Sequence, residues 1–212
     1  MVNPKSKVQT SKLKIKKTKT INLPLTKGNV LSLCVGDMVL INGQIVTGRD
    51  KLHKFLFNKK PSKKQIPFNL EGTILYHCGP IIKKTAKGFE LIAGGPTTSM
   101  RIEMYEHRII SEYGLRGVMG KGGMGRQTLN ALKENGCVYL HTIGGAGVYL
   151  ADRVKRVVNV WKLEDFGNTE AMWVFDVKEF PAIVTMDAHG GSLHEKIERS
   201  SYIEFKRLIG LR

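Results

Sequence analysis

The second half of the chain alternates between apolar runs, glycine-rich stretches and segments with helical spacing of apolar residues. Helices are predicted at 127–134 and 148–154, each directly after a glycine-rich loop. A repeated order of strand, glycine loop and helix is typical of a parallel α/β layer. The predicted strands of this half lie at 115–119, 137–143, 171–177 and 182–187.

The first half is richer in predicted strands. Apolar residues flank Asn42-Gly43 within 38–46, which predicts two short strands joined by a hairpin turn. A further strand is predicted at 73–78, closed by Gly79-Pro80. We see no internal repeat and no clear linker, so the pattern predicts one compact α/β domain with a β-rich flank.

Length and composition fit this picture. The chain has 212 residues, of which 42% are hydrophobic and 25% charged, as in an ordinary globular domain. These values exclude a wholly disordered or collagen-like chain. No apolar run approaches the roughly 18 residues of a membrane-spanning helix, and no secretory signal is evident. The three cysteines (Cys34, Cys78 and Cys137) are an odd number with wide spacing, which favours a reducing, cytoplasmic location over a disulfide framework.

The net charge of +16 is unevenly placed. Residues 1–20 hold seven lysines and no acid, and residues 49–64 hold seven basic residues and one acid. We interpret 1–20 as a basic, partly disordered tail, and 21–212 as the folded domain. An alternative prediction is that the tail adds an edge strand, with Val8, Leu13 and Ile15 as its apolar residues. Such a tail can bind nucleic acid or an acidic surface, but it has no aromatic residue for base stacking.

The first candidate site is the loop from Gly120 to Gly125. It matches a dinucleotide-binding pattern, but the acidic residue expected after the next strand is absent. A phosphate-binding P-loop also fails, because Leu115 and Gly122 stand where that motif needs Gly and Ser or Thr. What remains is Lys121 among four glycines before a helix, where backbone N–H groups can approach an anion. The alternative is a tight turn with a solvated lysine.

Two further segments are candidates for anion binding. If Thr97 or Thr98 begins a helix running to about Tyr113, Arg101 lies one turn after Thr97 on the same face, beside free N–H groups. Asp50 can likewise cap a short helix, and one turn would then present both Arg49 and His53. His53 is a possible proton donor near neutral pH. Each segment alone also fits an ordinary helix start.

Together, the candidate segments resemble the β half of the class I, iron–sulfur-dependent fumarases and of the related L(+)-tartrate dehydratases. The resemblance covers about residues 21–195. Its motifs are Val35-Gly36-Asp37, Gly48-Arg49-Asp50 with His53, Cys78-Gly79-Pro80, Gly95-Pro96-Thr97-Thr98-Ser99-Met100-Arg101, Gly120-Lys121-Gly122-Gly123-Met124, Gly144-Gly145-Ala146, Glu170-Ala171-Met172-Trp173, and Phe180-Pro181-Ala182-Ile183-Val184 leading to Asp187.

The resemblance implies a hydro-lyase that adds water to, or removes it from, a small dicarboxylate, in a single swivelling β/β/α domain. Arg49 and Arg101 match the family's carboxylate clamp, and Lys121 matches its anion-binding lysine. Thr97 matches a hydroxyl near the reacting carbon that assists proton transfer. His53 matches a histidine regarded as catalytic in the tartrate branch.

The resemblance also implies a 4Fe-4S cluster held by a separate α subunit, in an αβ or α2β2 assembly, with no metal bound by this chain. Cys34, Cys78 and Cys137 are not cluster ligands in the family pattern. We expect the chain alone to be inactive. We also expect Arg49, Arg101 and Lys121 to be exposed and unpaired in the isolated chain.

The motifs leave two substrates open. Fumarate hydration to (S)-malate is the commoner activity, and L(+)-tartrate dehydration is the alternative, because the same motifs occur in both branches. A basic nucleic-acid-binding module using residues 1–20 and 49–64 is the alternative from another class of protein. No recognition motif supports that alternative.

Overall fold

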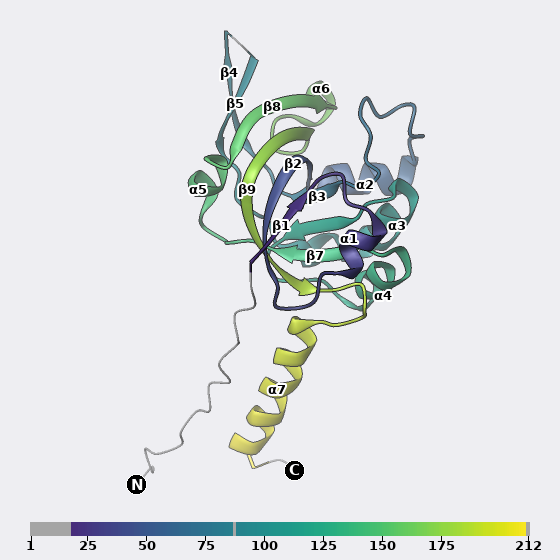
Figure 1. Cartoon of the computed structure of the whole chain (residues 1–212), viewed down its shortest axis with the longest axis vertical. Helices are drawn as coiled ribbons and strands as arrows, with labels where there is room; N and C mark the ends of the chain where they lie inside the picture. Colours follow the sequence, from purple (N-terminus) through teal and green to yellow (C-terminus); the bar gives the residue numbers. More distant parts are fainter. Residues whose placement is uncertain (1–17, 87, 211–212) are drawn as a thin grey trace.

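A computed structural model describes residues 18–86 and 88–210 (Figure 1). The strands are β1 (Lys19–Asn22), β2 (Met38–Gly48), β3 (Ile74–His77), β4 (Ile81–Thr85), β5 (Gly88–Ala93), β6 (Gly117–Gly120), β7 (Val138–His141), β8 (Val154–Trp161) and β9 (Met172–Met186). The helices are α1 (Lys27–Leu31), α2 (Asp50–Lys59), α3 (Glu103–Tyr113), α4 (Arg126–Asn135), α5 (Gly147–Ala151), α6 (Leu163–Phe166) and α7 (Leu193–Leu208), with a 3₁₀ turn η1 (Ser99–Ile102) before α3.

Seven strands form one mixed sheet in the order β1-β2-β3-β6-β7-β9-β8. Strands β1, β2, β3, β6 and β7 are parallel, whereas β9 runs antiparallel to β2, β7 and β8. Because β9 pairs with both β7 and β2, the sheet curls back on itself. The expected α/β fold is confirmed, with antiparallel strands added to the predicted parallel layer.

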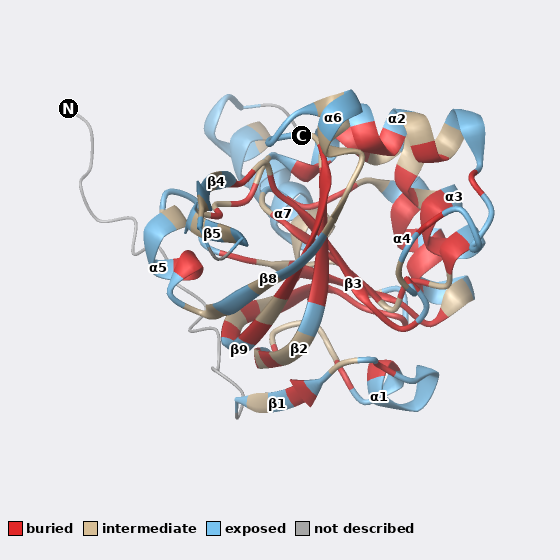
Figure 2. Cartoon of the chain, turned by 90° about the horizontal axis from the view of Figure 1, so that it is seen from above, coloured by how far each residue is buried: buried red, intermediate tan, exposed pale blue. Residues whose placement is uncertain are grey.

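Alternation along the strands separates two apolar cores. In β3, Ile74 and Tyr76 face the inside of the curled sheet, with Trp173 and Phe175 of β9. Leu75 faces the opposite way and packs with residues of α2, α3 and α4. These three helices cover one face of the sheet (Figure 2). The burial of both faces explains why the short central strands β3, β6 and β7 are almost entirely apolar.

The parallel strands all end at the same edge of the sheet. Strand β2 ends at Gly48, β3 at His77, β6 at Gly120 and β7 at His141. Their pairing register places Gly48 beside His77 and Gly120 beside His141. Arg49 directly follows Gly48 and Lys121 directly follows Gly120, whereas the Thr97 N–H donates to the His77 carbonyl. The topology therefore gathers these segments at the carboxyl edge, where α/β proteins commonly bind ligands.

The predicted hairpin at 38–46 is wrong. Strand β2 continues through Asn42-Gly43, with a bulge between Ile41 and Gly43 where it pairs with β9. Gly43 has a φ of 105°, and its Cα faces the backbone of Leu23 so closely that a Cβ would lie 3.1–3.4 Å from Leu23 atoms. The Asn-Gly pair therefore marks a bulge with close backbone approach rather than a turn.

The two strands predicted at 171–177 and 182–187 are one strand, β9. It continues through Glu179, whose φ is 51°, at the point where the register with β2 shifts. The helix predicted at 148–154 is the shorter α5, because the chain leaves the helix to form β8 on the edge of the sheet. The pairing of β8 with β9 is antiparallel and was not predicted.

The C-terminal helix α7 extends away from the body of the protein (Figure 1). None of its residues is buried, although its first turn contacts the glycine loop through His194 and Gly123. Among the described residues, no helix has the length and apolar character needed to cross a membrane. Most of the predicted tail, residues 1–17, lies outside the described residues, so its role stays a prediction.

Candidate active site

Arg49 and Arg101 converge on Asp50 at the carboxyl edge of the sheet. The Asp50 Oδ2 atom lies 2.7 Å from Arg101 Nη2 and 3.5 Å from Arg49 Nε. The side chain of Arg101 is 51% exposed, and that of Arg49 is 27% exposed. The structure thus brings the two predicted clamp arginines together, although they come from different loops.

The expectation that these arginines are unpaired is wrong. Besides the contacts with Asp50, the Nε atom of Arg49 lies 3.4 Å from Glu170 Oε1. Two neighbouring guanidinium groups repel each other, and the chain's own carboxylates compensate that charge. Gly79 makes room for this arrangement, because a Cβ there would lie 2.6 Å from Arg49 Cδ.

Thr97 and Lys121 are joined through their backbones. The Lys121 N–H donates to the Thr97 carbonyl at 3.2 Å, and the Ser99 N–H donates to the Lys121 carbonyl at 3.0 Å. The side chains of Thr97 and Lys121 are both half-buried. Arg101 follows Thr97 on the same loop, so four of the five predicted site residues lie along one edge. We call Arg49, Asp50, Thr97, Arg101, Lys121 and Glu170 the rim.

Thr97 does not begin a helix. It precedes the turn η1, and its own N–H donates to the His77 carbonyl at 2.8 Å. Thr98 is the N-cap residue but makes no capping hydrogen bond through its side chain. The free N–H groups expected at Thr97 and Ser99 are therefore already used within the chain. The group that this segment still offers to an anion is the Arg101 guanidinium, and its role in anion binding stays a prediction.

The N-terminus of α4, after the glycine loop, is also occupied. The carboxylate of Glu103 accepts from the Gly125 N–H at 2.8 Å and from the Thr128 N–H at 3.1 Å, and from the Thr128 hydroxyl at 2.7 Å. Glu103 is thus the anion at this helix start. Glu103 therefore occupies the helix start that was predicted to face an external anion, and anion binding by Lys121 stays a prediction.

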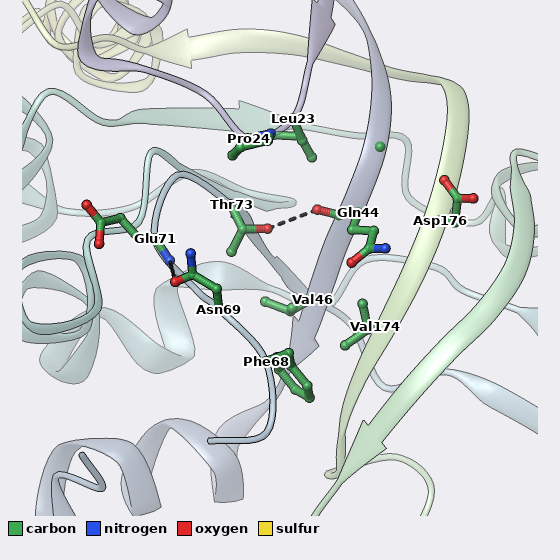
Figure 3. Close-up of a pocket in the computed structure, with 11 residues that line it drawn as sticks. Leu23, Pro24, Gln44, Val46, Phe68, Asn69, Glu71, Thr73, Val174 and Asp176 are labelled. Carbon is green, nitrogen blue, oxygen red and sulfur yellow. Dashed lines mark hydrogen bonds between the residues drawn. The ribbon is translucent and has the colours of Figure 1, made fainter. Parts of the chain in front are cut away.

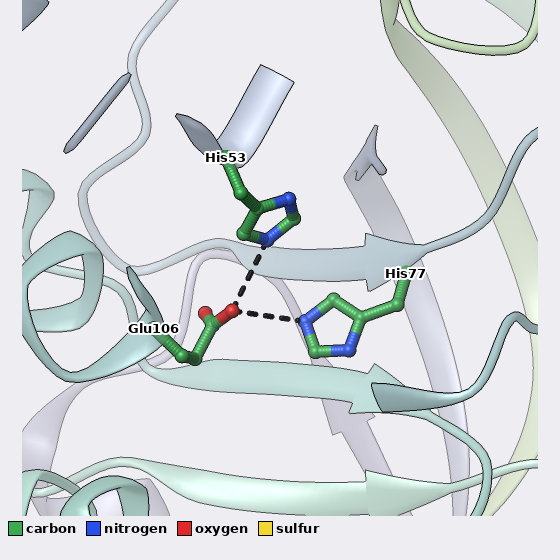
Figure 4. Close-up of side chains that lie close together, drawn as sticks. All are labelled: His53, His77 and Glu106. Carbon is green, nitrogen blue, oxygen red and sulfur yellow. Dashed lines mark ion pairs between the residues drawn. The ribbon is translucent and has the colours of Figure 1, made fainter. Parts of the chain in front are cut away.

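His53 is not presented beside Arg49 on the surface. Its side chain is fully buried, and its Nδ1 atom donates to the Arg49 carbonyl at 2.7 Å. Its Nε2 atom lies 3.1 Å from Glu106 Oε2, and His77 Nε2 lies 3.3 Å from the same oxygen (Figure 4). All three side chains are inaccessible to solvent, so the expected direct role of His53 in catalysis stays a prediction that lacks a substrate contact.

The buried contacts continue beyond His77. Its Nδ1 atom lies 2.9 Å from Ser99 Oγ, which lies 2.9 Å from the Tyr139 hydroxyl. That hydroxyl accepts from the Gly123 N–H at 3.3 Å. A side chain at Gly120 would collide with the Ser99 hydroxyl, so glycine is required there. We call His53, His77, Ser99, Glu106 and Tyr139 the buried cluster; of these, only His53 was predicted.

Charge in the buried cluster is compensated by its own members. Burial alone would raise the pKa of Glu106, but the two histidines outweigh it and lower that pKa to about 2. Burial alone would lower the pKa of His53, but the Glu106 carboxylate outweighs it and raises that pKa. Burial lowers the pKa of His77, and Glu106 offsets this only in part. These directions favour the charged forms of Glu106 and His53 and the neutral form of His77.

The cysteines do not form a cluster site. Cys78 and Cys137 are buried, and burial raises the pKa of each thiol well above its usual range, whereas cluster ligands are thiolates. Within 18–86 and 88–210, the one group of three or more potential metal ligands is His53, His77 and Glu106, with no cysteine among them. The residues that the structure describes, all three cysteines included, do not fit an iron–sulfur cluster.

A cavity of about 460 Å³ lies elsewhere in the protein (Figure 3). Its lining includes Thr73, which directly precedes β3, so it lies toward the amino end of that strand. The charged residues in its lining are Glu71 and Asp176, which would repel a dicarboxylate. None of the predicted site residues lines this cavity.

The fold and the rim define an α/β protein with a cation-lined site at the carboxyl ends of parallel strands. Residues 2–197 match the family model described as Fumarase C-terminus, and the chain belongs to this family. The resemblance inferred from the motifs is therefore confirmed.

Named relatives fall into two groups. The chain is 52% identical over 183 residues to a putative class I fumarate hydratase of Geobacillus stearothermophilus, covering 86% of this chain but only 34% of that relative. It is 41% identical over 188 residues to a putative L(+)-tartrate dehydratase subunit beta of Methanocaldococcus jannaschii, covering 88% of this chain and 96% of that one. It is 38% identical over 181 residues to the L(+)-tartrate dehydratase subunit beta of Escherichia coli, covering 82% and 86%.

Proposed function

We propose that this chain is the β subunit of a two-subunit class I fumarate hydratase, which reversibly hydrates fumarate to (S)-malate. The observation that carries the proposal is the convergence of Arg49 and Arg101 at the carboxyl edge, beside the loops of Thr97 and Lys121. Family membership and the name of the Geobacillus relative support the same activity.

In the proposed mechanism, the rim binds the two carboxylates of the substrate. Arginine meets a carboxylate with two parallel N–H donors, which fixes both its position and its plane. Asp50 and Glu170 hold the guanidinium groups in place before substrate enters. Lys121, whose backbone is bonded to that of Thr97, adds a further positive charge to this edge. These contacts hold the alkene of fumarate in one orientation, which a reaction at only one of its faces requires.

Hydration places a proton on one alkene carbon and the hydroxyl group of water on its neighbour, so all atoms of water enter the product. We assign Thr97 to the proton transfer. Its hydroxyl lies 3.3 Å from the His77 carbonyl, to which it donates, and this contact leaves the oxygen's lone pairs free to accept. A threonine hydroxyl is a weak base alone, so a group from the partner subunit must assist it.

The proposed partner is an α subunit that holds a 4Fe-4S cluster, in an αβ or α2β2 assembly. Two observations support this arrangement: relatives of similar length are named as beta subunits, and the cysteines of this chain do not form a cluster site. All three cysteines are unpaired, which supports a reducing, cytoplasmic location.

An L(+)-tartrate dehydratase β subunit is the second candidate. The names of the Methanocaldococcus and Escherichia relatives favour it, and these two relatives match this chain over most of their length. Tartrate differs from malate by one hydroxyl group. An enzyme distinguishes the two substrates through groups that form hydrogen bonds with that hydroxyl. In this proposal, the rim and the α subunit both contribute such groups.

Turnover by a reconstituted complex tests the proposal. This chain is co-expressed with candidate iron–sulfur α chains from the same genome, and the complex is assayed without oxygen on fumarate, (S)-malate and L-tartrate. Interconversion of fumarate and malate supports the main proposal, and turnover of L-tartrate alone supports the second candidate. If no α chain binds and nothing turns over, the hydro-lyase proposal is wrong, and salt-dependent nucleic-acid binding becomes the next test.

A further inference from the structure

The buried cluster contacts the backbone of the rim at two points through its histidines. His53 donates from Nδ1 to the Arg49 carbonyl at 2.7 Å. His77 offers its own carbonyl to the Thr97 N–H at 2.8 Å. Each histidine turns its other ring nitrogen toward Glu106 Oε2 (Figure 4). One carboxylate oxygen therefore lies between two of the loops that carry rim residues.

The cluster reaches the third loop through Ser99 and Tyr139. Ser99 connects His77 to Tyr139 through its hydroxyl, and its N–H donates to the Lys121 carbonyl at 3.0 Å. The Tyr139 hydroxyl accepts from Gly123, two residues after Lys121. A continuous set of side-chain and backbone contacts thus joins Glu106 to the loops of Arg49, Thr97 and Lys121.

We propose that Glu106 is a positioning residue for the rim. Its carboxylate holds His53 and His77 in fixed orientations, and through them it fixes the spacing of the three loops. The inference rests on the proposed function, because it assigns the spacing to the binding of a small dicarboxylate. Glu106 itself touches no substrate.

The cost of burying this carboxylate supports a role beyond packing. Glu106 lies within the buried stripe of α3, together with Ile109, Ile110 and Tyr113, in line with Ile102 at the end of η1. An apolar residue at that position would avoid the desolvation of a charge and is often as stable or more stable. Unlike an apolar side chain, a carboxylate at this position attracts the ring nitrogens of two histidines and so orients both imidazole rings.

The same three side chains are potential metal ligands, since their donor atoms lie within 4.8 Å of one another. They supply three donors, whereas an enclosed structural zinc site normally has four. The Nε2 atoms of His53 and His77 lie 3.1 and 3.3 Å from Glu106 Oε2, which is within ion-pair distance and requires no metal ion. Metal binding is accordingly an outcome of the test rather than the proposal.

The first test measures amide hydrogen exchange by NMR in the full chain. Glu106→Gln removes the charge but keeps the size of the side chain. The matched control is Ile110→Ala, which is one turn further along α3 and fully buried. We expect the Glu106→Gln variant to exchange the Ser99 and Lys121 amides about tenfold faster or more, with α4 amides little changed. Ile110→Ala is expected to speed exchange throughout the core without singling out the rim loops.

The second test measures kinetics in the complex with the α subunit. We expect kcat/KM of Glu106→Gln to fall by about tenfold or more, because small displacements of binding groups are costly in catalysis. The Ile110→Ala variant is expected to stay within about twofold of the wild type when assayed well below its unfolding temperature. Glu106→Asp, which restores the charge, is expected to recover part of the loss.

Equal exchange and equal kcat/KM in Glu106→Gln and the wild type would overturn the proposal, leaving the cluster as core packing. A stoichiometric metal ion in the purified chain that Glu106→Gln loses would also overturn it and assign a metal site. If rim exchange changes as expected but the wild-type complex turns over no dicarboxylate, Glu106 does position the rim and the proposed function is at fault.

Discussion

The rim and the buried cluster use similar residue types in opposite surroundings. In the rim, Arg101 and Asp50 form an ion pair with 51% and 38% of their side chains exposed. In the cluster, Glu106 and His53 form an ion pair with no exposure at all. Solvent screens the first pair, so it adds little to stability but leaves its charges accessible to a ligand. The second pair is inaccessible to ligands. Removing one of its partners leaves the other as a buried charge without compensation.

The largest expected effect on stability is in the cluster. Glu106→Ala leaves His53 without a countercharge and is expected to lower the free energy of unfolding by about 3–5 kcal/mol. Urea denaturation followed by circular dichroism measures the change. The exposed Glu204, paired with Arg207 on α7, provides the control, and Glu204→Ala is expected to leave the midpoint nearly unchanged. Similar midpoints for the two variants would remove the distinction between buried and exposed pairs.

The largest expected effect on activity is in the rim. Arg101→Ala removes one arm of the proposed clamp and is expected to lower kcat/KM of the reconstituted complex by about a hundredfold or more. The control is Arg156→Ala on the edge strand β8, where an exposed arginine pairs with Asp176. An equal loss in both variants would mean that Arg101 contributes only general positive charge.

The pH dependence of stability sharpens the comparison. The lowered pKa of Glu106 gives a stabilising contribution that is present above its usual value of 4.5 and is lost as pH falls toward about 2. The raised pKa of His53 gives a contribution that is fully present below 6.5 and is lost as pH rises through the raised value. The stability difference between the wild type and Glu106→Gln should therefore be largest between about pH 4.5 and 6.5. A difference that is flat across pH would contradict the ion pair.

A smaller loss of stability is expected at Ser99. Replacing it by alanine removes the hydroxyl between His77 and Tyr139, and leaves His77 Nδ1 without its partner. The expected cost is about 1–3 kcal/mol. Thermal and urea unfolding measure it, and Ser200→Ala on the exposed face of α7 is the control. A loss no greater than that of the control would show that the cluster ends at His77.

The smallest expected effect is on stability in the rim. Arg101→Ala breaks the exposed pair with Asp50 and is expected to change the free energy of unfolding by at most about 1 kcal/mol. The same variant thus loses activity while remaining stable. A loss of several kcal/mol in the same urea titration would show that the rim holds the fold together and is not only a ligand site.

The sequence could place Arg49 and Lys121 at one edge, because each lies shortly after a predicted strand, whereas Asp50 and Glu170 were not predicted as site residues. Parallel strands bring such loops to one edge wherever the exact strand boundaries fall. The pairing of Arg49 and Arg101 through Asp50 could not be predicted, since it joins loops about fifty residues apart. The backbone bonds of Thr97 and the cap supplied by Glu103 likewise depend on tertiary contacts.

The buried cluster left two signals that the sequence interpretation missed. Glu106 lies at helical spacing from Ile102, Ile109 and Ile110, so a carboxylate occupies the apolar face of the predicted helix. In β3, His77 follows Leu75 at strand spacing and therefore faces the same helices. A charged residue in an apolar stripe requires a buried partner, and a histidine at such a position is a candidate. The sequence does not show which histidines approach it.

Hydrogen exchange in the reconstituted complex, with and without (S)-malate, tests the central claim most directly. The account predicts slower exchange in this chain at the loops 48–53, 94–102 and 120–125 when malate is present, and loss of that protection in Arg101→Ala. Malate-dependent protection that leaves these loops unchanged, or that persists in full in Arg101→Ala, would contradict the assignment of the dicarboxylate site to the carboxyl edge of the sheet.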